Sequence, residues 1–141
     1  MYLHITPFRT TADIQKEFNA QFPYLKLEFF QKNFFGKQGS SLKKPLRESR
    51  KVGEVQMMVT DAEVEIREDM KVKELEKIFG DQLGLDVQVY RRSGNLWLET
   101  TMTDNWTLRQ QNEHGEEIST AGTKKNIFLQ DDYDLRRDND A

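Results

Sequence analysis

The residue types that most often carry catalysis are scarce in this sequence. It has two histidines, His4 and His114, and no cysteine. Neither histidine has a second one at metal-ligand spacing, and without cysteine there is no thiol nucleophile, disulfide or Cys-ligated zinc. The phosphate-holding patterns G-x-x-x-x-G-K-[ST] and G-x-G-x-x-G do not occur. We therefore expect no catalytic residue, no metal and no cofactor, and hence a protein that is not an enzyme.

Carboxylates are the one abundant reactive group. Five lie between Glu63 and Glu74, and three more lie between Asp131 and Asp134. Such oxygen ligands suit a divalent cation, but neither cluster follows the D-x-[DN]-x-[DN]-G loop pattern. We interpret both clusters as solvated surface charge.

Four aromatic side chains are candidates for partner binding. Strand alternation places Phe30, Phe35, Tyr90 and Trp97 on the sheet face opposite the predicted core. Exposed aromatics anchor protein interfaces, and they also stack on unpaired bases where lysines such as Lys26 lie beside them. The structural alternative is that they form cross-strand pairs or bury against the other half of the chain.

A basic segment is the second candidate for binding. Lys43, Lys44, Arg47, Arg50 and Lys51 fall within nine positions. They are suited to contact phosphates, or they form the solvated face of a short helix.

Charge also separates the two halves of the chain. Residues 1–60 carry ten Lys or Arg and five Asp or Glu, whereas residues 61–123 carry seven and fourteen. Such halves attract each other, or a second copy of the chain, while the overall net charge of −3 repels phosphate at long range.

Hydrophobic periodicity predicts the elements that position these residues. It predicts strand, helix and strand over 3–6, 14–22 and 25–30, and the same order again over 64–67, 72–83 and 85–90. In the strands predicted over 25–30 and 85–90, the side chains expected to face the core are Leu25, Leu27, Phe29, Leu85, Val87 and Val89.

Turn and capping residues set the expected boundaries. Thr10 or Thr11 and Asp69 are candidate N-caps, and Pro23 and Gly84 follow the two long helices. Residues 92–95 predict a hairpin turn, with a tighter turn at 31–33 in the first half and a strand over 96–102 in the second. A short helix over 106–114 is expected to end at Gly115, and its counterpart is expected to run from Pro45 to Gly53.

The matching order of elements predicts an internal duplication. Offsets of 61, 60 and finally 62 residues align the two halves, the last placing Leu46 on Leu108 and Gly53 on Gly115. We therefore expect one β-α-β-β-α unit over 1–60 and a second over 61–123. Residues 124–141 would add a strand over 126–130 and a polar, flexible, acidic tail.

The expected fold class is α+β, with a mainly antiparallel or mixed sheet and helices packed on one face. The first functional hypothesis is a non-catalytic protein–protein interaction module, an adaptor or a self-associating homodimer. The alternative is a nucleic-acid-binding protein that uses the sheet aromatics and residues 43–51. Without an apolar run of membrane-spanning length or a signal peptide, we expect a small soluble cytoplasmic protein with no membrane partner.

Overall fold

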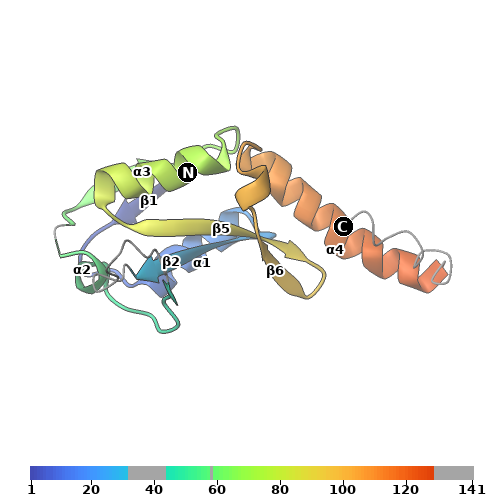
Figure 1. The fold of residues 1–141 in the computed structure, drawn as a ribbon, viewed down its shortest axis with the longest axis horizontal. Coiled ribbons are helices and arrows are strands. Elements are labelled where there is room, and N and C mark those ends of the chain that lie inside the picture. Colours follow the sequence, from blue (N-terminus) through green and yellow to red (C-terminus); the bar gives the residue numbers. More distant parts are fainter. Residues whose placement is uncertain (32–43, 58, 129–141) are drawn as a thin grey trace, which may run out of the picture.

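The computed structural model describes residues 1–31, 44–57 and 59–128, with side chains up to Thr120. This part of the chain is an α+β fold with four helices and two antiparallel sheets (Figure 1). The strands are β1 (Tyr2–Ile5), β2 (Leu25–Gln31), β3 (Lys44–Pro45), β4 (Ala62–Glu65), β5 (Asp86–Ser93) and β6 (Leu96–Glu99). The helices are α1 (Thr11–Gln21), α2 (Val52–Val55), α3 (Val72–Leu83) and α4 (Leu108–Phe128), with a 3-10 turn over Thr101–Thr103. The expected α+β class is confirmed.

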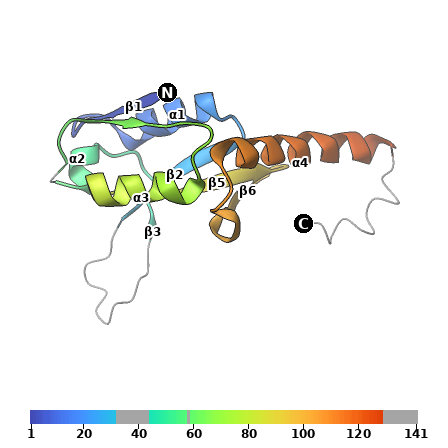
Figure 2. The same ribbon diagram turned by 90° about the horizontal axis from the view of Figure 1, so that it is seen from above.

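The smaller sheet pairs the first strand of each half. Strands β1 and β4 lie side by side and run antiparallel (Figure 2). Leu3 is paired with Val64. Leu3, Ile5 and Val64 are buried, whereas Tyr2, His4 and their neighbours in β4 face solvent. This is the alternation that a sheet with one covered face requires.

The larger sheet also joins the two halves. Its strand order is β3-β2-β5-β6, all antiparallel, and Glu28 of β2 lies opposite Gln88 of β5. The predicted core positions are all buried: Leu25, Leu27, Phe29, Leu85, Val87 and Val89. Because β1 pairs with β4 and β2 with β5, the halves share both sheets and one core.

Helices α1 and α3 cover the buried side of the large sheet. Ile14 and Phe18 of α1 and Leu75 and Phe79 of α3 are fully buried, and the rings of Phe29 and Phe79 meet edge to face at 6.3 Å. Apolar residues at helical spacing produce this packing because they fall on one helix face.

The ends of these helices follow the local signals in part. The Thr10 side chain caps α1 by accepting a hydrogen bond from the Asp13 N–H, and Gly84 ends α3 with φ of 66°. The expected N-cap at Asp69 is wrong. Lys71 is the residue before α3, and its N–H donates to Glu74 at 2.8 Å, while Asp69 pairs with Arg67.

The short helix of the first half lies later than expected. Pro45 belongs to strand β3, and helix α2 covers only Val52–Val55. Backbone bonds tie the start of α2 to the start of α1: Thr11 N–H donates to Arg50 C=O, and Val52 N–H donates to Arg9 C=O. These long-range bonds determine that α2 begins at Val52, whereas a proline such as Pro45 is only a local signal for a helix start.

The second half repeats this hydrogen-bond pattern at its own helix starts. Val72 N–H donates to Trp106 C=O, and Leu108 N–H donates to Met70 C=O. In this pattern Val52 takes the place in the first half that Leu108 takes in the second, whereas the expected offset of 62 pairs Leu108 with Leu46.

Helix α4 is longer than the sequence signals indicate. It starts at Leu108, passes through Gly115 and continues to Phe128, projecting beyond the rest of the fold in both views (Figures 1 and 2). Residues 126–128 are thus helical where a strand was expected over 126–130, and residues 129–130 lie outside the described part. The strand expected over 96–102 ends at Glu99 and gives way to the 3-10 turn.

Gly115 has a packing role inside α4. A Cβ atom there would meet the Tyr24 Cβ at 2.9 Å, the Arg91 Cγ at 3.0 Å and the Arg92 carbonyl oxygen at 3.3 Å. The glycine is needed for close approach of α4 to the sheet, so it does not end the helix as a stop signal would.

Candidate binding surfaces

The aromatic candidates do not form one exposed patch. Phe30 is only 7% exposed, which agrees with the structural alternative of burial and not with an exposed anchor on the open sheet face. It lies opposite Pro45 of β3 and Asp86 of β5, and this flanking on both sides removes it from solvent. Tyr90 and Trp97 are partly buried, and Phe35 lies outside the described residues.

Tyr90 faces carboxylates on the open sheet face. Burial, together with the charges of Glu99 and Glu28, raises the pKa of the Tyr90 phenol. The neutral phenol, which is already the form present at neutral pH, thus persists to higher pH.

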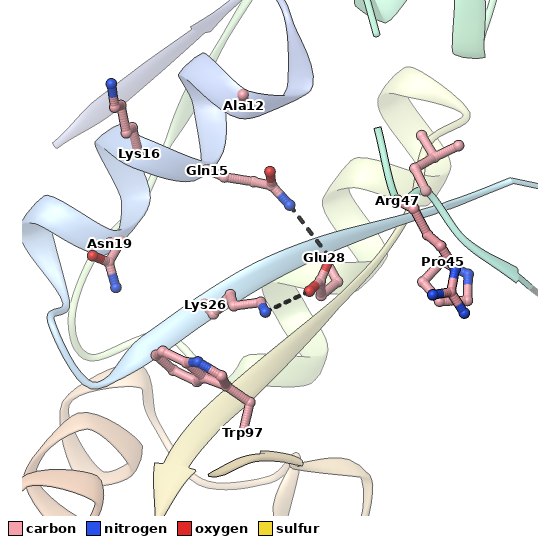
Figure 3. A pocket seen from close by; sticks show the side chains of 10 residues that line it. Ala12, Gln15, Lys16, Asn19, Lys26, Glu28, Pro45, Arg47 and Trp97 are labelled. Carbon is pink, nitrogen blue, oxygen red and sulfur yellow. Dashed lines mark hydrogen bonds and ion pairs between the residues drawn. The ribbon is translucent and has the colours of Figure 1, made fainter. Parts of the chain in front are cut away.

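Trp97 has cationic neighbours on the same face of the sheet. The Lys26 Nζ lies 5.3 Å from the Trp97 ring centroid, and the Arg92 guanidinium carbon lies 6.0 Å from it. Lys26 also pairs with Glu28 at 2.8 Å (Figure 3). These contacts are within the range of cation–π attraction and hold the indole beside a positive charge.

A groove of about 740 Å³ opens beside Trp97 along the outer side of β2. Figure 3 shows α1 on one side, with β2 and Trp97 on the other and Arg47 at the far end. Its lining residues are Ala12, Gln15, Lys16, Asn19, Lys26, Glu28, Pro45, Leu46, Arg47 and Trp97.

Two amide side chains of α1 donate hydrogen bonds to backbone carbonyls on the edge of β2 in this groove. Gln15 donates to the Leu27 carbonyl at 2.8 Å, and Asn19 donates to the Leu25 carbonyl at 2.9 Å. These carbonyls are therefore already bonded, which discourages another strand from pairing along this stretch of β2.

The basic segment lies at the far end of the groove. Lys44, Arg47 and Arg50 line a second hollow of about 470 Å³, which shares Pro45, Leu46 and Arg47 with the first. Lys51 is exposed and bridges to Thr10 ahead of α2. Lys43 lies outside the described residues.

Lys16 is the positively charged groove residue that the sequence analysis missed. It lies on the polar side of α1, at helical spacing from Ala12 and Asn19. The helical spacing places these three residues on one face of α1. However, no local sequence pattern indicates that this face lies beside Pro45–Arg47, about thirty residues later in the chain. Within residues 1–31, 44–57 and 59–120, the side chains of Lys16, Lys44, Arg47 and Arg50 form no ion pair.

Strand β6 presents a second, apolar surface. Leu96 is 63% exposed and Leu98 is 41% exposed, and Met102 follows them at 95%. Among the described residues, β6 is an edge strand of the four-stranded sheet. Exposed apolar residues on an unpaired edge are a recognised site of strand pairing between molecules.

The histidines and acidic residues serve other contacts. His4 lies 3.9 Å from Glu63, and Glu68 pairs with Arg109 at 3.0 Å, which lowers the pKa of the Glu68 carboxyl. Among the residues described, no three His, Asp or Glu side chains converge to hold a metal ion. In the same part of the chain, no helix is long and apolar enough to cross a membrane.

A polar cluster lies between α4 and β5. Gln111 is fully buried; it accepts a bond from Arg91 at 2.9 Å and donates to the Thr103 carbonyl at 2.8 Å. Burial lowers the pKa of the Arg91 guanidinium, whose buried Nε has no partner in the described part. These hydrogen bonds pair the polar groups of the Gln111 side chain, and without them the burial of this residue of α4 would be unfavourable.

Comparison with protein-family models, with curated proteins and with solved structures gives no match to this chain.

Proposed function

We propose that the protein is a non-catalytic interaction module that self-associates through antiparallel pairing of β6 with β6 of a second copy. The observation that carries this proposal is the exposure of Leu96 and Leu98 on an edge strand. Burying these leucines removes apolar area from water, and the strand edge supplies main-chain hydrogen bonds.

The orientation of the backbone supports this pairing. Val89 N–H donates to the Glu76 side chain, and Val89 C=O accepts from the Thr100 hydroxyl. The backbone N–H and C=O groups of Val89 in β5 therefore point away from β2. The direction of the backbone N–H and C=O groups alternates from residue to residue along a strand. The backbone groups of Arg91 and Ser93 therefore point toward β6, where these residues lie opposite Leu98 and Leu96. The backbone groups of Trp97 and Glu99 consequently point outward, toward an incoming strand.

Charge complementarity supports a second copy as the partner. An antiparallel pair centred on Leu98 places Glu99 of each copy opposite Trp97 of the other. Lys26 and Arg92 lie beside that Trp97, so each Glu99 meets a positive environment. The same two-fold pairing sets Leu98 against Leu98 at the centre of the interface.

Light scattering tests this association. We expect the wild-type chain to have twice its 16.7 kDa mass, and the double substitution Leu96→Lys with Leu98→Lys to be monomeric. Met57→Lys is the matched control, because Met57 is 83% exposed but lies outside β6. A wild-type monomer at all soluble concentrations contradicts the proposal.

A proline substitution separates strand pairing from simple apolar contact. Glu99→Pro removes an N–H that points outward and leaves the β5–β6 ladder intact, so it should also produce monomers. A Glu99→Pro dimer as stable as wild type would mean that side chains alone hold the copies together.

We also infer that the two halves arose by duplication. Support comes from the strand registers, because Leu3 and Val64 lie opposite each other at an offset of 61, and Glu28 and Gln88 at an offset of 60. Residues that correspond by these offsets are therefore partners at the centre of each sheet, as an approximate two-fold axis requires. The repeated hydrogen bonds at the helix starts support the same relation.

A further inference from the structure

The two hollows beside β2 adjoin each other, and together we call them the trough. They share Pro45, Leu46 and Arg47, so the trough extends from Trp97 past these residues to Arg50 and Lys44. Except for Trp97, all its lining residues come from the basic half of the chain, residues 1–60. An open hollow lined by several elements fits an extended chain better than a compact small molecule.

The trough is electrostatically positive along its length. Lys16 lies on α1, Lys26 on β2, and Lys44, Arg47 and Arg50 on the segment that follows. The carboxylates that line it are Glu28 and Glu48, and Glu28 is neutralised by Lys26 at 2.8 Å. The four remaining cations have no ion-pair partner in the described part of the chain, so they are free to bind an anion.

We propose that this trough binds single-stranded nucleic acid, with phosphates on Lys16, Arg47 and Arg50 and a base stacked against Trp97. Distributed cations that follow a backbone, with an aromatic ring beside them, are the combination that single strands use. The indole is already held against Lys26, so it presents an aromatic surface and a charge together.

The net charge of −3 does not prevent this binding. At physiological ionic strength charges are screened beyond roughly 8 Å, so a polyanion in the trough responds mainly to the side chains that line it. Those side chains carry five positive and two negative charges.

Anisotropy of a labelled, mixed-sequence single-stranded oligonucleotide, titrated with the full chain at several salt concentrations, measures the binding. We expect affinity to fall with salt, and the double substitution Lys16→Gln with Arg47→Gln to reduce the slope of log K against log salt by about 1.4. The control is Lys73→Gln with Lys77→Gln on α3, which removes the same charge away from the trough and should leave the slope unchanged.

Fluorescence of Trp97 tests the stacking contact. In a Trp106→Phe background Trp97 is the only tryptophan, and the oligonucleotide should quench it. Trp97→Leu should weaken oligonucleotide binding several-fold, with folding checked by circular dichroism.

Three outcomes overturn the proposal. The first is the absence of oligonucleotide binding at low salt. The second is an equal loss of affinity in the trough and control variants. The third is binding of an acidic peptide of equal charge as tight as that of the oligonucleotide, which would assign the trough to a protein ligand. Trp97 belongs both to the trough and to the proposed β6 interface, whereas Lys16 and Arg47 lie outside β6. The Lys16→Gln with Arg47→Gln variant therefore tests oligonucleotide binding apart from self-association, and the mass of each variant reports self-association.

Discussion

The ionisation of His114 depends on how its ring packs in the folded protein. Its ring meets Trp106 edge to face at 5.3 Å, and Glu117 lies 4.0 Å from its Nδ1. Burial and the nearby charge of Arg91 lower the pKa of His114 below its usual 6.5, against the weaker opposite effect of Glu117. The folded state therefore binds the proton less well than the unfolded state does.

This difference predicts a pH-dependent loss of stability. Because the folded pKa is the lower one, the contribution of His114 is complete above 6.5 and is lost as the pH falls from there through the folded pKa. Urea unfolding at pH 7.5 and 5.5 should show a smaller decrease for His114→Gln than for wild type. His4→Gln is the control, because His4 is exposed; an unchanged decrease in His114→Gln would contradict the assignment.

At the scale of elements, two of the helical glycines, Gly80 and Gly115, have opposite roles. Gly115 of α4 lies against Tyr24, Arg91 and the Arg92 carbonyl, with no room for a methyl group. Gly80 of α3 is exposed and has nothing within 4 Å of the position that a Cβ would take. The same residue type is a packing requirement in one helix and only a cost to helix stability in the other.

Alanine at these two positions should therefore shift stability in opposite directions. Gly115→Ala should destabilise by about 1–3 kcal/mol through overpacking against the backbone of β5. Gly80→Ala should stabilise by about 0.5–1 kcal/mol, because alanine favours the helix. Thermal and urea unfolding measure both changes, and a neutral Gly115→Ala would mean that α4 moves away from the sheet at little cost.

For the whole molecule, the important feature is that every central strand pair joins the two halves. β1 pairs with β4, and β2 pairs with β5, so each half alone would expose two strand edges and half of the core. Short domains bury too small a fraction of their surface to tolerate such a loss.

We therefore expect fragments 1–60 and 61–141 not to fold separately. Circular dichroism and denaturant titration should show no cooperative transition for either fragment alone, and an equimolar mixture should recover one. A cooperative transition in fragment 1–60 alone would instead show that the first half is an independent domain.

The sequence by itself determined strands β1, β2, β4 and β5 and helices α1 and α3, because period-two and helical patterns reflect which face of each element is buried. It predicted the burial of Leu27, Phe29 and Val89 and the ends of α1 and α3 at Pro23 and Gly84. These properties depend on residues within one or two turns of each other, so they are visible in the local pattern.

Only the tertiary structure decided the features that depend on distant segments. Phe30 is buried because β3 and β5 flank it, and Gly115 lies within α4 because the helix packs against the sheet there. The trough joins Lys16 to Trp97, which lie on separate elements far apart in the chain. Alternation along a strand specifies which side a residue faces, but the neighbours that cover that side are set by the pairing of the two halves.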